Sequence, residues 1–186
     1  MILFKERGIK RMVAKKLVNH LIMEQLIIPG RKHTSQTILK NPTRFSIYRY
    51  ITEEKVAQYS EVKMKLGISS ESMYRIHLES LENFGLIKNF AFGGIRLLCS
   101  NEMNEEKAVY YYRLKKKKYF DIINLFCNSG SLRIVDINLH LKIDAKYSVK
   151  NLVEIDLIIK KNKKYIINPD KKEEIKKIIN HIKLKK

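Results

Sequence analysis

The spacing of apolar residues along the chain predicts a protein that is mainly helical. Over residues 9–26, apolar side chains recur at intervals of three and four, and lysines fall on the other side. The apolar positions that define this first helix are Ile9, Met12, Val13, Leu17 and Leu21. Pro29 and Gly30 end the helix, and residues 31–40 are polar and turn-like.

Residues 41–116 read as three helices followed by strands. Asn41 is expected to cap a helix with Pro42 at its first position, and a short helix follows over residues 60–66, capped by Ser60. Ser69 is expected to cap the third helix, which Gly85 ends. Its apolar face consists of Tyr74, Leu78, Leu81 and Phe84. Strands are predicted over residues 86–88, 95–99 and, from their aromatic content, 108–114.

Residues 117–186 repeat this order of elements. Helices are predicted over residues 117–128, 133–141 and 144–155, and strands over residues 157–159 and 165–167. A lysine-rich loop over residues 160–164 joins the two strands, and Pro169 opens a C-terminal helix. The apolar stripe of that helix, expected to pack within its own chain, is Ile175, Ile178, Ile179 and Ile182.

The two halves show a weak sequence repeat. Leu66-Gly67-Ile68-Ser69 aligns with Leu141-Lys142-Ile143-Asp144 at an offset of 75, and Leu86-Ile87 aligns with Leu157-Ile158 at an offset of 71. The third helix of the second half is therefore expected to be four residues shorter. Duplication predicts an N-terminal helical arm (1–40) and two similar domains (41–116 and 117–186), and chance similarity is the alternative.

Charge adds the strongest indication of function. The 186 residues include 38 Lys and Arg against 19 Asp and Glu, a net charge of +19. The net charge is +7 over residues 1–40, +3 over 41–116 and +9 over 117–186. Nucleic acid is the commonest partner of such a basic chain, and a lysine-rich proteome is the alternative explanation.

Other features limit the setting. No apolar stretch approaches the roughly 20 residues that span a bilayer, so no membrane partner is expected. Lys5, Glu6 and Arg7 interrupt the apolar start, which argues against a signal peptide. Cys99 and Cys127 form no CxxC pair, so we expect buried thiols in a reducing cytoplasm rather than a zinc ribbon or a disulfide framework.

The segment from Leu66-Gly67-Ile68-Ser69 to Phe84-Gly85-Leu86-Ile87 resembles the winged helix-turn-helix of ArsR-type and MarR-type transcription regulators. In those proteins a short helix ends in LGIS, the recognition helix follows, and GLI opens the wing. Residues 109–114 look like the return strand of an ArsR-type wing. Two features depart from the pattern: the third helix has one residue more, and the wing between Phe90 and Lys107 is long and acidic. The resemblance implies an α+β, mainly α fold with two tandem winged helices.

The resemblance also implies where double-stranded DNA would bind, because a winged helix lays its third helix in the major groove and its wing on the backbone. In the first domain the outward candidates are Ser69, Ser72, Arg75 and Ile76, although Glu71, Glu79 and Glu82 on the same helix repel phosphate. In the second domain they are Arg133, Lys142, Lys146, Tyr147, Lys150, Asn151, Lys160, Lys161, Lys163 and Lys164. The alternative is that these residues form an ordinary solvated surface.

The stripe of the first helix is expected to pair with a second copy, because palindromic half-sites need a dimer, or to pack onto its own chain. No phosphate loop, HExxH motif or cysteine pair is present, so neither an enzyme nor a metal or other cofactor is expected.

The leading hypothesis is a sequence-specific DNA-binding transcription regulator acting with the transcription machinery. The alternatives are a replication initiator and a tandem winged-helix scaffold that binds proteins. The Lys- and Ile-rich composition hints at an AT-rich, archaeal genome.

Overall fold

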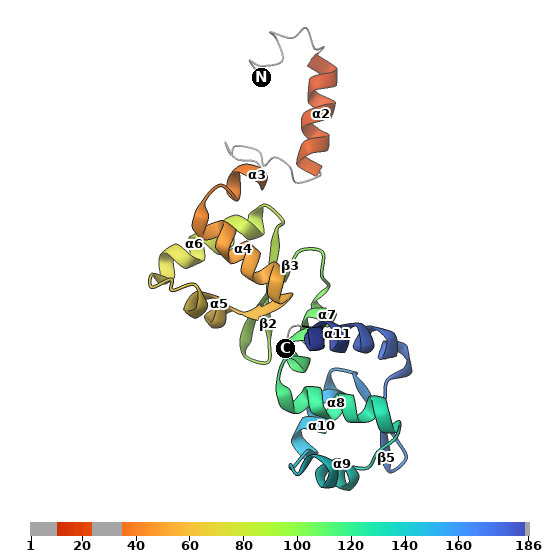
Figure 1. Ribbon diagram of the computed structural model, residues 1–186. Coiled ribbons are helices and arrows are strands. Elements are labelled where there is room, and N and C mark those ends of the chain that lie inside the picture. The colour runs from red at the N-terminus through yellow and green to blue at the C-terminus, as the bar shows by residue number, and fades with distance from the viewer. Residues whose placement is uncertain (1–10, 24–34, 185–186) are drawn as a thin grey trace. The chain divides into compact units, whose positions relative to one another are not determined.

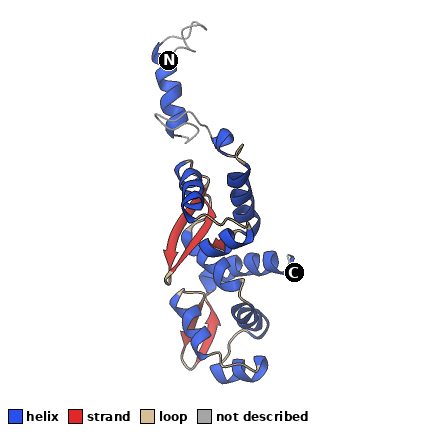
Figure 2. Ribbon diagram, turned by 90° about the vertical axis from the view of Figure 1, so that its left-hand side faces the viewer, coloured by secondary structure: helices blue, strands red, loops and turns tan. Residues whose placement is uncertain are grey.

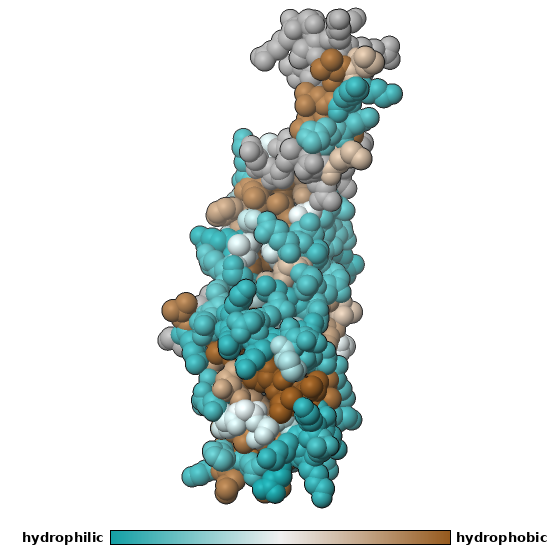
Figure 3. Space-filling view, turned by 90° about the vertical axis from the view of Figure 1, so that its right-hand side faces the viewer, coloured by the Kyte–Doolittle hydropathy of each residue, from teal (hydrophilic) through white to brown (hydrophobic). Residues whose placement is uncertain are grey.

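The computed structural model describes residues 11–23 and 35–184. They form an α+β structure, mainly helical, with two small antiparallel sheets (Figures 1 and 2). The chain divides into two compact units, Met1–Met103 (unit 1) and Asn104–Lys186 (unit 2). Among these described residues, no helix is both long and apolar enough to cross a bilayer. Hydrophilic side chains dominate the face shown in Figure 3.

The N-terminal part contains α2 (Arg11–Met23) and α3 (Ser35–Ile38). The segment 35–38, predicted to be turn-like, thus forms one turn of helix. Of the predicted dimerisation stripe, Ile9 lies outside the described residues, Met12, Val13 and Leu17 are exposed, and Leu21 is half-buried. Homodimer formation through this stripe therefore stays a prediction.

Unit 1 continues with three helices whose starts are fixed by local hydrogen bonds. They are α4 (Pro42–Glu54), α5 (Tyr59–Lys65) and α6 (Glu71–Asn83). Asn41 Oδ1 accepts from the backbone N–H of Arg44 at 3.0 Å, as expected of the predicted cap. Ser70, rather than Ser69, caps α6, and α5 begins after Gln58 rather than at Ser60.

A three-stranded antiparallel sheet completes unit 1. The strands are β1 (Val56–Gln58), β2 (Ile87–Phe92) and β3 (Ile95–Ser100), in the order β1-β3-β2. Gly93 and Gly94 form the tip of the β2–β3 hairpin, where both have positive φ, a conformation that glycine adopts without a steric penalty. The predicted α6 stripe is buried, and Tyr74, Leu78, Leu81 and Phe84 pack in the core with Ile47 and Ile51.

The prediction of a strand over residues 108–114 is wrong. These residues belong to helix α7 (Glu105–Leu114), which Asn104 caps by accepting from the backbone N–H of Lys107 at 2.8 Å. Glu105 and Glu106 occupy its first turn, where carboxylates favour a helix. The acidic residues that were predicted to lie in the first wing therefore begin α7. The first hairpin ends at Ser100, and the two glycines at its tip are uncharged. Because α7 packs on α8 and α11, the units divide after Met103 rather than after residue 116.

Unit 2 continues with α8 (Lys117–Ser129), α9 (Ile134–Leu141) and α10 (Lys146–Glu154). The hairpin strands β4 (Ile158–Lys161) and β5 (Lys164–Ile167) follow, and then a 3₁₀ turn η1 (Pro169–Lys171) and α11 (Lys172–Leu184). The apolar stripe of α11 is buried, as predicted: Ile175, Ile178, Ile179 and Ile182.

The two units repeat one order of elements. In unit 1 this order is α4, β1, α5, α6 and the β2–β3 hairpin. In unit 2 Leu132 takes the place of β1, because Leu132 and Tyr165 of β5 exchange two backbone hydrogen bonds of 3.0 and 2.7 Å. In both units the segment before the second helix of this order therefore pairs with the second strand of the hairpin. Gly85 and Asp156, which align at the offset of 71, both have positive φ after the third helix. Helix α6 has 13 residues and α10 has 9, the expected difference of four.

Candidate nucleic-acid interface

The outer face of α10 carries cations and one large aromatic residue. Val149 and Leu152 are buried, which fixes the rotation of the helix. Lys146, Tyr147 and Lys150 are consequently exposed, and the Tyr147 side chain is 70% exposed. Lys150 Nζ lies 3.8 Å from Glu154 Oε1, and both side chains are well exposed, so this ion pair is weak.

The β4–β5 hairpin supplies a second group of lysines. Lys161 pairs with Lys164 across the two strands, and the two-residue turn is Asn162-Lys163, with Asn162 at a φ of 56°. All four predicted wing lysines are exposed: Lys160, Lys161, Lys163 and Lys164. In the part of the chain that the structure describes, none of the four forms a salt bridge. Four exposed cations on one hairpin form a surface that suits a polyanion.

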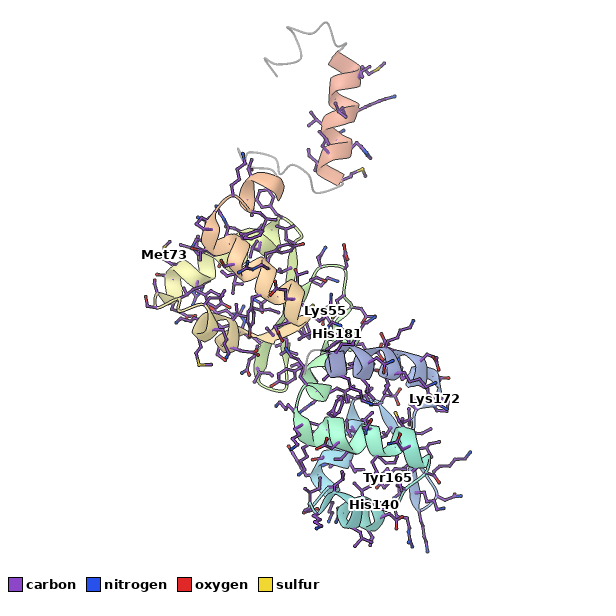
Figure 4. All side chains as sticks on the ribbon, viewed as in Figure 1. Lys55, Met73, His140, Tyr165, Lys172 and His181 are labelled. Carbon is purple, nitrogen blue, oxygen red and sulfur yellow. The ribbon has the colours of Figure 1, made fainter. Side chains whose placement is uncertain are left out.

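An open depression of about 460 Å³ lies between α10 and the hairpin. It brings together Lys146, Tyr147 and Lys150 of the helix with Lys160 of β4 and Tyr165 of β5. Lys160 and Tyr165 are direct cross-strand partners, so they share one face of the hairpin (Tyr165 is labelled in Figure 4). Four residues predicted separately, three on a helix and one on a wing, thus line one site.

Asn151 is not part of this surface. Its side chain is 5% exposed, and its Nδ2 donates a hydrogen bond of 2.9 Å to the hydroxyl of Tyr119 in α8. Asn151 lies three residues after Ser148, so the two side chains share one face of α10. Both are buried because this face packs on α8. The prediction that Asn151 lies on the exposed side of this helix is therefore wrong.

We expect Asn151→Ala to destabilise the fold without changing DNA affinity. The substitution removes the amide donor to the buried Tyr119 hydroxyl, which should cost about 1–3 kcal/mol in the free energy of unfolding. Urea unfolding would measure the loss, and binding would be measured at a temperature where the variant is folded. Weaker binding by the folded variant would return Asn151 to the interface.

Arg133 and Lys142 flank α9. The guanidinium of Arg133 donates to Asp136 through Nε and Nη2, both at 3.1 Å. These hydrogen bonds lower the pKa of Asp136 and raise that of Arg133, so both groups are charged at neutral pH. Arg133 is thus engaged in capping α9, whereas Lys142 is exposed at its end with a left-handed φ of 51°. Neither lines the depression.

The corresponding face of unit 1 has a different charge. At the offset of 71, Arg75 and Ile76 correspond to Lys146 and Tyr147, and all four are exposed. Ser69 and Ser72 are exposed as well. However, Glu79 corresponds to Lys150, and the first hairpin has Gly93-Gly94 where the second has Asn162-Lys163. This face therefore combines opposite charges with exposed apolar side chains.

Glu71 offsets the positive charge of Lys63 on the unit 1 face. It accepts hydrogen bonds from Lys63 Nζ and from the Tyr59 hydroxyl, both at 2.6 Å, and these lower the pKa of its carboxyl group. The face thus lacks the uniform positive charge of unit 2.

Three features of the site escaped the sequence reasoning. Tyr165, Val153 and Ile134 also line the depression, but only the strand register and the helix packing place them there.

Cys99 is buried as expected, whereas Cys127 is exposed on the last turn of α8. Within residues 11–23 and 35–184, no group of three or more His, Cys, Asp or Glu side chains could hold a metal ion.

Neither a scan against protein-family models nor a search of curated proteins finds a match to this chain.

Proposed function

We propose that the chain binds double-stranded DNA through unit 2 and acts as a winged helix-turn-helix transcription regulator. The observation that carries this proposal is the placement of exposed lysines on two elements that border one depression. The order of elements also supports the proposal, since α10 follows two helices and precedes the β4–β5 hairpin. In a winged helix these would be the recognition helix and the wing.

The proposed division of roles follows from the side chains. Lys160, Lys161, Lys163 and Lys164 on the hairpin contact phosphates, which positions the protein but carries no sequence information. Lys146, Tyr147 and Lys150 on α10 face the major groove, which is wide enough to admit a helix. Sequence preference then comes from these few side chains and from the deformability of the DNA.

A protein-binding role for unit 1 is the second candidate. The side chains of Met64, Met73 and Ile76 are 72%, 49% and 52% exposed around α5 and α6. Flexible methionines suit a protein partner, and Glu71 and Glu79 disfavour phosphate. A scaffold that binds through unit 1 would hold its partner at high salt.

Selection of bound fragments from genomic DNA, with affinity followed against salt, tests the proposal. One enriched palindromic site near a promoter is the result expected of a dimeric regulator, and iterated sites at an origin would indicate an initiator. Salt-sensitive binding without enrichment would contradict sequence specificity. Absence of binding at low salt would contradict DNA binding altogether and leave the protein scaffold.

A reciprocal charge exchange at equivalent positions separates the two units. We expect Lys150→Glu to weaken binding to a duplex by about tenfold at 0.1 M salt, because it replaces a cation in the major groove with an anion that the surrounding phosphates repel. Glu79→Lys should change affinity by less than about twofold, although it raises the net charge. Fluorescence anisotropy would measure both. Opposite changes of equal size would show that total charge, rather than the unit 2 face, determines affinity.

A further inference from the structure

The depression in unit 2 has an apolar and aromatic lining that phosphate contacts do not need. Tyr147 and Tyr165 contribute two aromatic rings, and Ile134 and Val153 contribute aliphatic surface. Tyr147 is 70% exposed and Val153 is 37% exposed, although both side chains gain free energy when they are covered. The volume of about 460 Å³ lies within the range of sites for small molecules, roughly 300–1,000 Å³.

Charged groups surround this lining. Lys146 and Lys150 lie one turn apart on α10, and Lys160 lies on the hairpin beside Tyr165. Asp144 also lines the depression, and its Oδ1 accepts from the backbone N–H of Lys146 at 3.0 Å. The carboxylate has a second oxygen, which can accept from an amino group. Aromatic rings for stacking, cations for phosphate and one acceptor for an amino group together match the chemistry of a nucleotide.

We propose that this depression binds one unpaired base of a nucleic acid strand, stacked on Tyr147, with the neighbouring phosphates held by Lys146, Lys150 and Lys160. The inference rests on the proposed DNA binding by the same face and extends it from paired to locally opened DNA. A base within a duplex already stacks on its neighbours, so only an unpaired base can offer its face to the tyrosine without a cost for unstacking. The chain should therefore prefer DNA that contains an unpaired segment.

The experiment uses the full chain and two DNA probes of the same length at the same salt. One is a fully paired duplex, and the other has three unpaired bases at its centre. Three variants are compared with the unchanged protein: Tyr147→Ala, Tyr147→Phe, and Ile76→Ala at the equivalent position of unit 1. Because Tyr147 is mostly exposed, its replacement should leave the fold intact, and circular dichroism would verify this.

The unchanged protein should bind the opened duplex about 5- to 150-fold more tightly than the paired one, the range that stacking of one base gives. Tyr147→Ala should bring the ratio of opened-duplex affinity to paired-duplex affinity down to about one, whereas Tyr147→Phe and Ile76→Ala should keep the ratio of the unchanged protein. Equal affinity for both probes, or a preference that survives Tyr147→Ala, would overturn the inference and leave duplex binding in place. Binding to neither probe would overturn the proposed function as well.

Discussion

Replacing Lys160, Lys161, Lys163 and Lys164 with alanine should reduce the salt dependence of DNA binding more than any other surface change. Each phosphate contact releases counterions, so loss of four contacts flattens the slope of log affinity against log salt by up to about 4. At 0.1 M salt this corresponds to a loss of affinity on the order of a thousandfold. The expectation depends on the exposure of all four side chains on one hairpin, without a salt bridge among the described residues.

Helix α11 offers a matched control. It also carries four exposed lysines, so their replacement lowers the net charge by the same amount: Lys172, Lys176, Lys177 and Lys183. That variant should keep most of the salt slope. Titrations at four or five salt concentrations would measure both slopes. An unchanged slope in the hairpin variant, or equal flattening in both, would remove the hairpin from the proposed interface.

Phe126→Ala should have the largest effect on stability. Phe126 is 1% exposed on α8, and α8 packs on α9, α10 and β5. Removing a buried phenyl group typically costs about 3–5 kcal/mol, a large part of the stability of a small domain. Because α10 packs on α8, DNA binding should be lost together with the fold of unit 2.

Leu81→Ala is the matched change in unit 1. Leu81 is fully buried in the core of that unit, so the substitution should cost about 2–5 kcal/mol there. Amide hydrogen exchange would show which unit loses protection, and anisotropy would follow DNA binding. If Leu81→Ala abolished binding and Phe126→Ala did not, the interface would belong to unit 1.

Helical periodicity, glycine positions and short apolar runs were sufficient to predict most helices and the existence of both hairpins. The second hairpin was predicted with a loop over residues 160–164, but its strands extend to Lys161 and from Lys164, which leaves a turn of two residues. The stripe of α6 and the end of that helix at Gly85 follow directly from spacing and backbone chemistry. Residues 108–114 were assigned wrongly because three successive tyrosines favour a strand on composition. The stronger signal was Asn104 followed by Glu105 and Glu106, a capping residue with carboxylates in the first turn.

The residues of the candidate site were harder to predict than its charge. The lysines of α10 and the hairpin are evident from the sequence, but Tyr165 joins them only through its pairing with Lys160. Asn151 was expected on the exposed side with Lys146, Tyr147 and Lys150, whereas its hydrogen bond to the Tyr119 hydroxyl holds it against α8. Long-range packing and strand register, which one sequence does not encode locally, thus decide the lining of the depression.

The length of α10 limits how much genetic information the proposed interface could read. Nine residues rise about 13 Å along the helix axis, which matches about four base pairs. A given sequence of four base pairs recurs roughly every 250 base pairs in random DNA. A single unit would therefore encounter very many competing binding sites in a genome. A regulator that uses this helix would consequently gain selectivity by recognising a second feature of the DNA. That feature would be either another short sequence bound by a second copy at a fixed spacing or unpaired bases exposed at a few melted sites.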